Sequence, residues 1–396
     1  MPTLSLYHLT PEVGRTFRLG QRGIEQEETG LHLPSDTLFA ALLIALLESG
    51  VDPGRVVENF PRLALDNTPL AAVGPPPFLL TSAFPRAGQV RFYPALPLSL
   101  MLSQAQIDAL HRANRLKELK RVKFISEGLF NQIVAGHYLD DRLPAQNEPH
   151  PSDRGLYLQN GALWLAAEEI ERLPEAIKKS NRQANLYQAL RRRAVFRVNK
   201  TPRVTVDRQH NGSTIYHTGR LIFNQDCGLW FGLAWAGDAA PEMRQWVSTA
   251  LALLADEGLG GERSAGYGHF TIEATETDPI TYADPADGDL FVTLSRYHPT
   301  PAELPHALAD SRTQYTLTPV SGWLWSPQAS AQRRRRLWLT AEGSALRAVG
   351  GGPWGEVVDV RPVYGQASFP HPVWRYGLAC PVSLKNHPAQ EANYVV

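Results

Sequence analysis

The sequence is poor in cysteine and carries no excess charge, and both absences exclude classes of protein. Its 396 residues include two cysteines, Cys227 and Cys380. Two thiols supply neither a four-cysteine zinc site nor a disulfide framework, which is typical of a reducing cytoplasm. The 39 Lys and Arg residues balance 39 Asp and Glu. A strongly basic chain is therefore excluded, and any surface that binds a polyanion has to be a local patch.

Long apolar segments and catalytic signatures are missing too. The first residues, Met-Pro-Thr-Leu-Ser-Leu, contain neither a basic leader nor an apolar run. The apolar stretch at 38–47 is too short to span a membrane. The sequence has no His-Glu-x-x-His and no Gly-x-Ser-x-Gly motif. We therefore expect a cytoplasmic protein that is not an enzyme, does not contact a membrane, and uses no metal or cofactor.

Glycine, in contrast, is concentrated in one short segment, residues 258–268. This segment follows a helical pattern at 241–257 and precedes a strand-like run at 270–276. A helix C-cap needs one glycine, whereas five allow positive φ angles and the close approach of another backbone. The five are Gly258, Gly260, Gly261, Gly266 and Gly268. We favour a loop that holds a ligand over the alternative, an ordinary C-cap followed by a tight turn.

The side chains of this glycine-rich loop indicate the class of ligand. Arg263 offers a fork of donors that suits a phosphate, Ser264 adds a hydroxyl, and Tyr267 adds a ring that can stack on a base. A Walker phosphate loop is excluded, because it needs Gly-Lys-Ser/Thr at the start of a helix. A dinucleotide fingerprint is excluded as well, because it needs three glycines that follow a strand. The loop therefore predicts a site for a nucleic-acid backbone.

Basic residues gather in two further stretches despite the neutral total. Residues 172–208 contain eleven Lys or Arg against two acidic residues, and 112–123 contain six against one. Aromatic residues that can stack on bases lie among them: Phe124, Tyr187 and Phe196. These stretches favour a polyanion groove on one face, although a solvated helix face remains an alternative for 178–193. For the run Arg333 to Arg336, we favour a solvent-facing hairpin or a contact with a partner over the main RNA site.

The remaining pattern predicts an α+β fold with two domains. Apolar periodicity indicates helices at 37–48, 104–119 and 241–257, the first with Ser35 as N-cap and Asp36 in its first turn. The strands expected in the first domain are 3–9, 78–84, 90–94, 164–166, 221–223, 229–235 and 270–276. Strand, helix, two strands, helix, strand is the ferredoxin-like order, here with a long insertion at about 104–225.

A second, β-rich domain is expected after an acidic, proline-containing linker at 277–288. The N-terminal domain then covers 1–276 and the C-terminal domain 289–396. Strands of the second domain are expected at 289–296, 313–326, 337–340 and 373–384.

Several segments in a fixed order resemble the RAMP superfamily of CRISPR effector proteins. They are Arg18-Leu19-Gly20, Leu33 to Leu42, Lys123-Phe124-Ile125-Ser126, Pro202 to Arg208 followed by Tyr216-His217, and the glycine-rich loop. In this order they are similar to the type III-A subunit that caps the 5′ end of the guide RNA, the fourth subunit of the Csm complex. The resemblance runs from about residue 14 to 270, and it implies two ferredoxin-like (RRM-like) domains. One departure is Glu262, where Lys or Arg is expected in many members.

The resemblance implies a non-catalytic, crRNA-binding subunit of an antiviral ribonucleoprotein. Such a subunit would recognise the repeat-derived 5′ tag, with target RNA as an indirect partner. It would also bridge the large palm-domain signalling subunit to a backbone RAMP subunit. Arg263 and the N–H groups of Gly260 and Gly261 would hold phosphates. The implied RNA-binding residues are Arg18, Gly20, Ser35, Lys123, Phe124, Ser126, Arg203, Arg208, Gly258, Gly260, Gly261, Arg263, Ser264, Gly266 and Tyr267.

Two other functions stay open. A metal-independent crRNA-processing endoribonuclease of the same superfamily would use general acid–base chemistry, with His217, Tyr267 and His269 as candidates. A purely structural scaffold protein would show no salt-sensitive RNA binding.

Overall fold

The computed structural model describes residues 3–12, 14–20, 29–144, 154–178, 191–206, 213–237, 239–326, 329–364 and 367–385. The predicted site residue Arg208 and the aromatic residue Tyr187 lie outside these ranges. No helix within the described ranges combines the length and the apolar character needed to cross a membrane.

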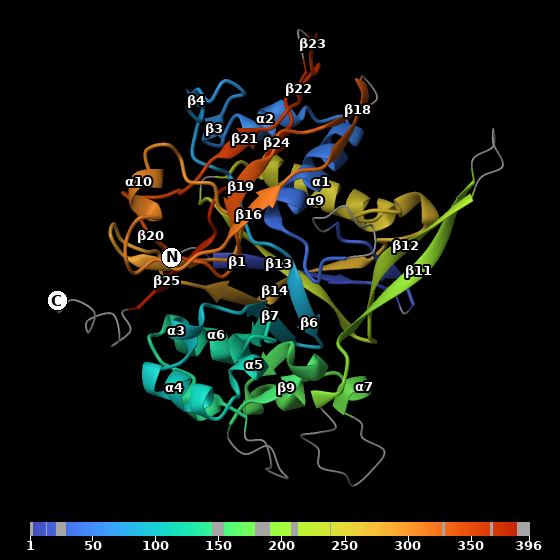
Figure 1. Cartoon of the computed structure of the whole chain (residues 1–396). Helices are drawn as coiled ribbons and strands as arrows, with labels where there is room; N and C mark the ends of the chain where they lie inside the picture. The colour runs from blue at the N-terminus through green and yellow to red at the C-terminus, as the bar shows by residue number, and fades with distance from the viewer. Residues whose placement is uncertain are drawn as a thin grey trace.

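A largely antiparallel sheet carries the N-terminal half of the molecule (Figure 1). Its strands are β1 (Thr3–Thr10), β5 (Phe78–Leu80), β6 (Phe84–Ala87), β7 (Val90–Pro94), β8 (Phe124–Ser126), β9 (Leu156–Leu158), β10 (Leu163–Leu165), β13 (Cys227–Trp235) and β14 (Thr271–Thr281). They follow the order β14-β1-β13-β6-β7-β8-β10-β9, and β5 also pairs with β13. β1 lies between β14 and β13, and its alternate residues Leu4 and Leu6 are buried, so one face of this strand packs into the core.

Two long helices pack side by side over this sheet, α1 (Ser35–Glu48) and α9 (Pro241–Glu257) (Figure 1). The chain passes from β1 through α1 to β6, with β13 between the two strands in the sheet. It passes from β13 through α9 to β14, with β1 between them. This is the split arrangement of the ferredoxin-like pattern. A mixed α and β fold is thus confirmed, and a second ferredoxin-like domain in the C-terminal half stays a prediction.

The start of α1 differs from the sequence prediction. Pro34 occupies the cap position in an extended conformation, and no side chain caps the helix. The expectation that Ser35 is the N-cap is wrong, because its hydroxyl accepts a hydrogen bond from the Arg296 N–H at 2.9 Å. Asp36 does lie in the first turn.

The insertion contains several short helices, drawn below the sheet in Figure 1. The single helix expected at 104–119 is two helices, because Asn114 adopts a left-handed φ of 54° between them. Within the described ranges, the shorter α-helices are α2 (Pro53–Val57), α3 (Leu98–Met101), α4 (Gln104–Arg112), α5 (Leu116–Leu119), α6 (Glu127–Val134), α7 (Glu175–Lys178) and α10 (Leu304–Ala307).

A long β-hairpin projects from the body at the end of the insertion (Figure 1). It consists of β11 (Phe196–Val206) and β12 (Ser213–Phe223), whose residues pair along their full length. The strand expected at 221–223 covers only the last part of β12. These last residues pair with the short strand β2 (Thr16–Phe17), so the base of the hairpin is joined to the segment that precedes α1.

The expected linker is shorter than the sequence indicated. β14 continues to Thr281, where it pairs with Thr3 of β1. Residues 277–281 are therefore part of the sheet, and the connection between the halves is confined to the residues before β15 (Leu290–Thr293).

The C-terminal half is built from short paired strands. β15 pairs with β20 (Ala345–Arg347) and β25 (Pro381–Leu384), β16 (Leu317–Val320) with β19 (Leu337–Thr340), β17 (Trp323–Ser326) with β18 (Ala329–Arg333), β21 (Val357–Asp359) with β24 (Trp374–Arg375), and β22 (Val363–Tyr364) with β23 (Ala367–Ser368). β21 also pairs in parallel with β3 (Arg62–Leu63), whose other neighbour is β4 (Pro69–Leu70). Strands from the two halves therefore share one sheet.

The two halves also share one hydrophobic core. Tyr376 packs against Phe39 and Phe60, with ring centroids 5.1 and 6.2 Å apart. Its hydroxyl accepts a hydrogen bond from the Leu80 N–H at 2.9 Å. Because the ring is fully buried, this contact fixes the C-terminal half against the first helix and the sheet.

Candidate nucleic-acid interface

The glycine-rich loop follows α9 and doubles back on itself. Gly260 and Gly268 have φ of 94° and 86°, in the left-handed region that favours glycine. A Cβ atom at Gly260 would lie 2.3 Å from the Arg18 carbonyl oxygen, and one at Gly268 would lie 2.2 Å from that of Leu259. Both positions require glycine because another backbone passes too close for a side chain. The structure thus supports the interpretation that several glycines permit close backbone approach.

Backbone hydrogen bonds tie the loop to the segment before α1. The Gly261 N–H donates to the Arg18 carbonyl at 2.8 Å, and the Gly268 N–H donates to that of Thr16 at 2.8 Å. The prediction that the Gly261 N–H holds a phosphate is wrong for this conformation, since that donor is already used. Arg18 was predicted to help shape the site, and the structure brings it directly against the loop.

Basic and aromatic side chains from three separate segments meet at the loop. Arg203, on β11, donates a hydrogen bond from Nη2 to the Tyr267 hydroxyl at 3.4 Å. Arg220, on β12, stacks over the Tyr267 ring with its guanidinium carbon 4.9 Å from the centroid. Arg18 Nη1 donates to Glu262 Oε1 at 2.8 Å. Tyr267 is itself 7% exposed, so its ring offers little surface for the predicted stacking on a base.

The loop encloses an open cavity of about 490 Å³, lined by Glu257, Gly260, Glu262, Arg263, Ser264 and His269. Arg263 lies at its rim with 43% of its side chain exposed, and its Nη1 atom is 3.5 Å from Glu257 Oε2. Partial burial and the adjacent Glu257 carboxylate raise the pKa of Glu48. The lining of the cavity therefore combines one guanidinium group, that of Arg263, with the carboxylates of Glu257 and Glu262.

Four further predicted residues lie away from the loop. Phe124 and Ser126 are buried in β8, where the Ser126 hydroxyl accepts a hydrogen bond from the Ala166 N–H at 3.1 Å. Lys123 is exposed beside them, and Gly20 is exposed before α1. Buried side chains that already have protein partners cannot contact RNA without rearrangement, so Phe124 and Ser126 are not carried into the proposed site.

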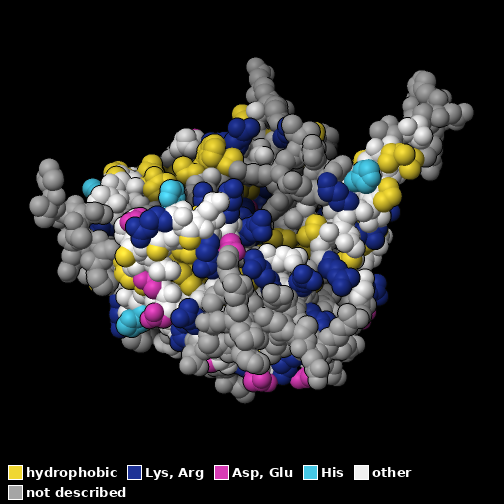
Figure 2. Space-filling model, turned by 60° about the horizontal axis from the view of Figure 1, so that its bottom comes forward, with side chains coloured by type: hydrophobic (Ala, Val, Ile, Leu, Met, Phe, Trp, Pro, Cys, Tyr) yellow, Lys and Arg dark blue, Asp and Glu magenta, His cyan; other side chains and the backbone are white. Residues whose placement is uncertain are grey.

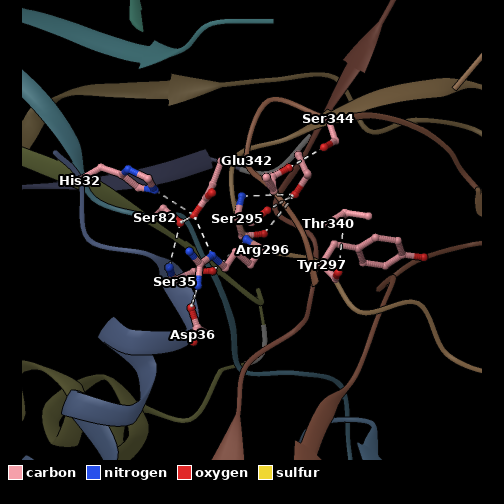
Figure 3. A network of polar contacts seen from close by, with 12 residues as sticks. His32, Ser35, Asp36, Ser82, Ser295, Arg296, Tyr297, Thr340, Glu342 and Ser344 are labelled. Atoms are coloured by element: carbon pink, nitrogen blue, oxygen red, sulfur yellow. Dashed lines mark hydrogen bonds and ion pairs between the residues drawn. The ribbon is translucent and has the colours of Figure 1, made fainter. Parts of the chain in front are cut away.

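Ser35 belongs to a buried network that joins the two halves (Figure 3). Its backbone N–H donates to the Ser82 hydroxyl at 2.8 Å, and Ser82 donates in turn to Glu342. The neighbouring Asp36 is fully buried and accepts a hydrogen bond from Arg296 Nη1 at 2.9 Å. Because Ser35 is also fully buried, its predicted contact with RNA is replaced by a structural role.

The glutamate of that network is held in its charged form. Burial alone would raise the pKa of Glu342, but His32, Arg296 and the Ser82 hydroxyl together lower it well below the usual range. The Arg296 Nε and Glu342 Oε1 atoms are 3.7 Å apart. The network therefore stabilises the interface between the halves and leaves no side chain of its own at the loop.

Sequence reasoning missed Arg220 as a member of the site. Arg220 pairs with Asn199 and shares one face of the hairpin with Arg203 and Tyr216, because side chains of a strand alternate between faces. No local pattern indicates this contact, because the strand expected at 221–223 leaves Arg220 outside and the pairing with β11 is not visible in the sequence.

The three candidates for acid–base catalysis do not converge. His217 pairs with Pro202, so it lies on the face of the hairpin opposite to Arg203 and Tyr216. Tyr267 belongs to the glycine-rich loop, and His269 follows it directly. Among the described residues, no group of three His, Cys, Asp or Glu could hold a metal ion.

The surface around the base of the hairpin is rich in Lys and Arg side chains (Figure 2). They extend across the middle of this face toward the projecting hairpin, and few acidic side chains interrupt them. The Arg333 to Arg336 run lies elsewhere, between β18 and β19, where Arg333 packs over the Trp323 ring and Arg334 donates to the Ser321 carbonyl.

Comparisons with known proteins point to one family. Residues 286–384 match the family model for the CRISPR Csm4 C-terminal domain. Over 177 residues, the chain is 29% identical to the CRISPR system Cms protein Csm4 of Streptococcus thermophilus, covering 44% of this chain and 53% of the relative. Over 169 residues, it is 32% identical to that of Mycobacterium tuberculosis (strain CDC 1551 / Oshkosh), covering 40% and 52%. The chain thus aligns with about half the length of these curated relatives.

The fold is found in a solved structure as well. A chain from the crystal structure of the Csm3–Csm4 subcomplex in the type III-A CRISPR-Cas interference complex covers 97% of this chain, with a TM-score of 0.60 and 15% identity. All of that chain is covered, so the similarity of fold includes the insertion and both halves. The expected resemblance is confirmed: residues 286–384 match the Csm4 C-terminal domain, part of the chain is similar in sequence to curated Csm4 proteins, and the fold is that of a chain in the Csm3–Csm4 subcomplex.

Proposed function

We propose that this chain is a crRNA-binding subunit of a type III-A CRISPR interference complex and that it grips the repeat-derived 5′ tag. The observation that carries the proposal is the convergence of Arg18, Arg203 and Arg220 on the glycine-rich loop, next to an open cavity. Guanidinium groups bind phosphates through paired donors, so this convergence suits the backbone of an RNA.

Each residue of the proposed site has a separate role in binding RNA. Arg263, exposed at the rim of the cavity, contacts a backbone phosphate, and the Ser264 hydroxyl adds a further donor. Arg203 and Arg220 neutralise the neighbouring phosphates from the hairpin side. Lys123 extends the same basic surface toward the insertion. Tyr267 orients the two hairpin arginines through its hydroxyl and ring.

The proposed protein partners are based on the complexes in which similar proteins occur. Csm4 occurs with Csm3 in the solved subcomplex whose chain has this fold, which supports a backbone RAMP subunit as one neighbour. The large palm-domain signalling subunit is the second neighbour that we propose, with target RNA as an indirect partner. The subunit would then join the two around the 5′ end of the guide.

We propose that the chain itself does not cut RNA. His217 lies on the hairpin face opposite to Arg203, whereas Tyr267 is in contact with Arg203. This separation supports the proposal, because a general acid and a general base have to reach the same ribose. A processing endoribonuclease remains the alternative outcome of the test described next.

The proposal is tested by binding of labelled guide RNA with an intact or a scrambled 5′ tag, over a series of salt concentrations. We expect tag-dependent, salt-sensitive binding of RNA that stays intact on a gel. Arg263→Ala should weaken binding by about 1–3 kcal/mol if its contact is bidentate. Arg55→Ala, which removes an exposed arginine paired with Glu242 on α9, is the control and should leave binding unchanged. Cut RNA would support the nuclease, and binding that ignores both salt and tag would contradict the proposed site.

A further inference from the structure

One acidic residue lies among the arginines of the loop. The two carboxylate oxygens of Glu262 face different strands: Oε1 is 2.8 Å from Arg18 Nη1, and Oε2 is 3.9 Å from Arg203 Nη2. The Glu262 side chain is 26% exposed, and those of Arg18 and Arg203 are 19% and 35% exposed. The carboxylate therefore bridges the two guanidinium groups at a position that solvent, and hence RNA, can reach.

The backbone sets the position of this carboxylate. Glu262 adopts a left-handed conformation, with φ 62° and ψ 25°, which non-glycine residues adopt rarely. Its carbonyl accepts hydrogen bonds from the N–H groups of Ala265 and Tyr267, at 2.9 and 3.3 Å. The backbone of Glu262 is therefore held without the ion pair, and the ion pairs to Arg18 and Arg203 position its carboxylate. The fold of the loop is secured separately, by the backbone bonds to Thr16 and Arg18.

A carboxylate between two arginines presents the same pair of anionic oxygens as a phosphate. It also repels a phosphate that binds beside it, since like charges at close range oppose each other. Arg18 and Arg203 are the arginines that the proposed function assigns to the RNA backbone. The RNA therefore has to displace Glu262, or bind against its charge, before it can use them.

From this geometry we infer that Glu262 is an internal competitor of the RNA backbone for Arg18 and Arg203, an inference that rests on the proposed function. It lowers the affinity for every RNA whose phosphates use these two arginines by the same factor, whether or not the bases make contacts of their own. The ratio of affinities between two such RNAs is therefore unchanged, because an equal free-energy cost cancels from the difference that sets specificity.

The test compares the whole protein with its Glu262→Gln variant, which keeps the shape of the side chain and removes the charge. Dissociation constants are measured for guide RNA with intact and with scrambled 5′ tags, across a salt series. We expect both RNAs to bind more tightly by a similar factor, about 3- to 10-fold, and the ratio between their dissociation constants to stay the same. The salt dependence should steepen by about 0.7 in log–log slope for each arginine that is freed to meet a phosphate of the single strand.

Glu242→Gln is the matched control. It makes the same change in net charge at the first turn of α9, where Glu242 is 58% exposed and is paired with Arg55 at 3.5 Å. This variant should change neither the affinities nor the salt dependence. A matching gain from Glu242→Gln would overturn the inference, because it would assign the effect to net charge.

Two other outcomes contradict the inference in distinguishable ways. If Glu262→Gln leaves both affinities unchanged or weakens them, while Arg18→Ala and Arg203→Ala reduce binding, the site is correct and the carboxylate does not compete. If Arg18→Ala and Arg203→Ala have no effect on RNA binding, the proposed site itself is wrong. Thermal unfolding of each variant establishes that a change in binding does not come from a loss of folded protein.

Discussion

Asp36 illustrates, at the scale of single residues, how a buried charge can connect distant parts of a chain. Its side chain is fully buried, and two arginines of the C-terminal half approach it. Arg296 Nη1 is 2.9 Å from Oδ1, and Arg375 Nη1 is 3.7 Å from Oδ2. The two guanidinium groups are also largely buried, at 15% and 11% exposure. The carboxylate therefore compensates charges that have little access to water.

We expect Asp36→Ala to destabilise the protein by about 3–5 kcal/mol, because removing one partner of a buried ionic group leaves the others uncompensated. Urea unfolding measures the change in the free energy of unfolding. Glu12→Ala breaks an exposed pair with Arg15 and should cost no more than about 1 kcal/mol. Equal losses in the two variants would contradict the importance of burial.

At the scale of elements, the glycine-rich loop depends on which glycine meets another backbone. Gly266 and Gly268 both have positive φ, at 79° and 86°. A Cβ atom at Gly266 would have as its nearest neighbour the end of the Arg15 side chain, at 3.9 Å. At Gly268 it would lie 2.2 Å from the Leu259 carbonyl oxygen. The two positions therefore separate backbone strain from steric collision.

Gly266→Ala should cost about 1–2 kcal/mol of stability, the ordinary penalty for a left-handed alanine, and should retain RNA binding. Gly268→Ala should cost more and should also weaken RNA binding, because the backbone contacts of the loop have to move. Urea unfolding and the labelled-RNA assay measure the two effects. Similar behaviour of both variants would show that the close approach at Leu259 does not shape the site.

The elements that the sequence predicts well are those determined by local pattern. The helix expected at 241–257 is observed as Pro241–Glu257, and the strand expected at 337–340 as Leu337–Thr340. The hairpin of β11 and β12 was missed, since Arg197, Lys200 and Arg203 resemble a basic stretch when the pairing of strands is unknown. The linker was placed too early because proline and aspartate are typical of loops, whereas pairing with β1 extends β14 to Thr281.

Some features of the candidate site could also be predicted from local sequence, and others depend on residues that are distant in the chain. The location of the loop follows from its glycines, and the exposed Arg263 follows from residue type. The bridge between Glu262 and Arg18 joins residues 244 positions apart, so no local pattern could indicate it. Ser35 resembles a cap in the sequence, but its partner Arg296 comes from the other half of the chain.

At the scale of the whole molecule, the two halves share a sheet and a hydrophobic core. Strand β3 of the first half pairs with β21 of the second, and Tyr376 lies in the core among aromatic rings of the first half. The division into domains expected near residue 277 therefore does not correspond to a division of the core.

We expect calorimetry of the full chain to show a single unfolding transition. Tyr376→Phe should lower the stability of the whole transition by about 1–3 kcal/mol, because it leaves the buried Leu80 N–H without its acceptor. A trace with two transitions, of which only one shifts in the variant, would contradict a shared core. Tyr315→Phe, which alters a tyrosine that is 40% exposed, is the control and should leave the transition in place.

The pairing of Asp36 with Arg375 has a consequence for synthesis on the ribosome. The Arg375 side chain also donates to the Asp36 carbonyl, and the two residues lie 339 positions apart. At about 5–20 residues per second, translation needs roughly 20–70 s to cover that distance. During this interval the Asp36 carboxylate has to remain solvated. The nascent N-terminal half cannot bury it against its partner until Arg375 has been synthesised.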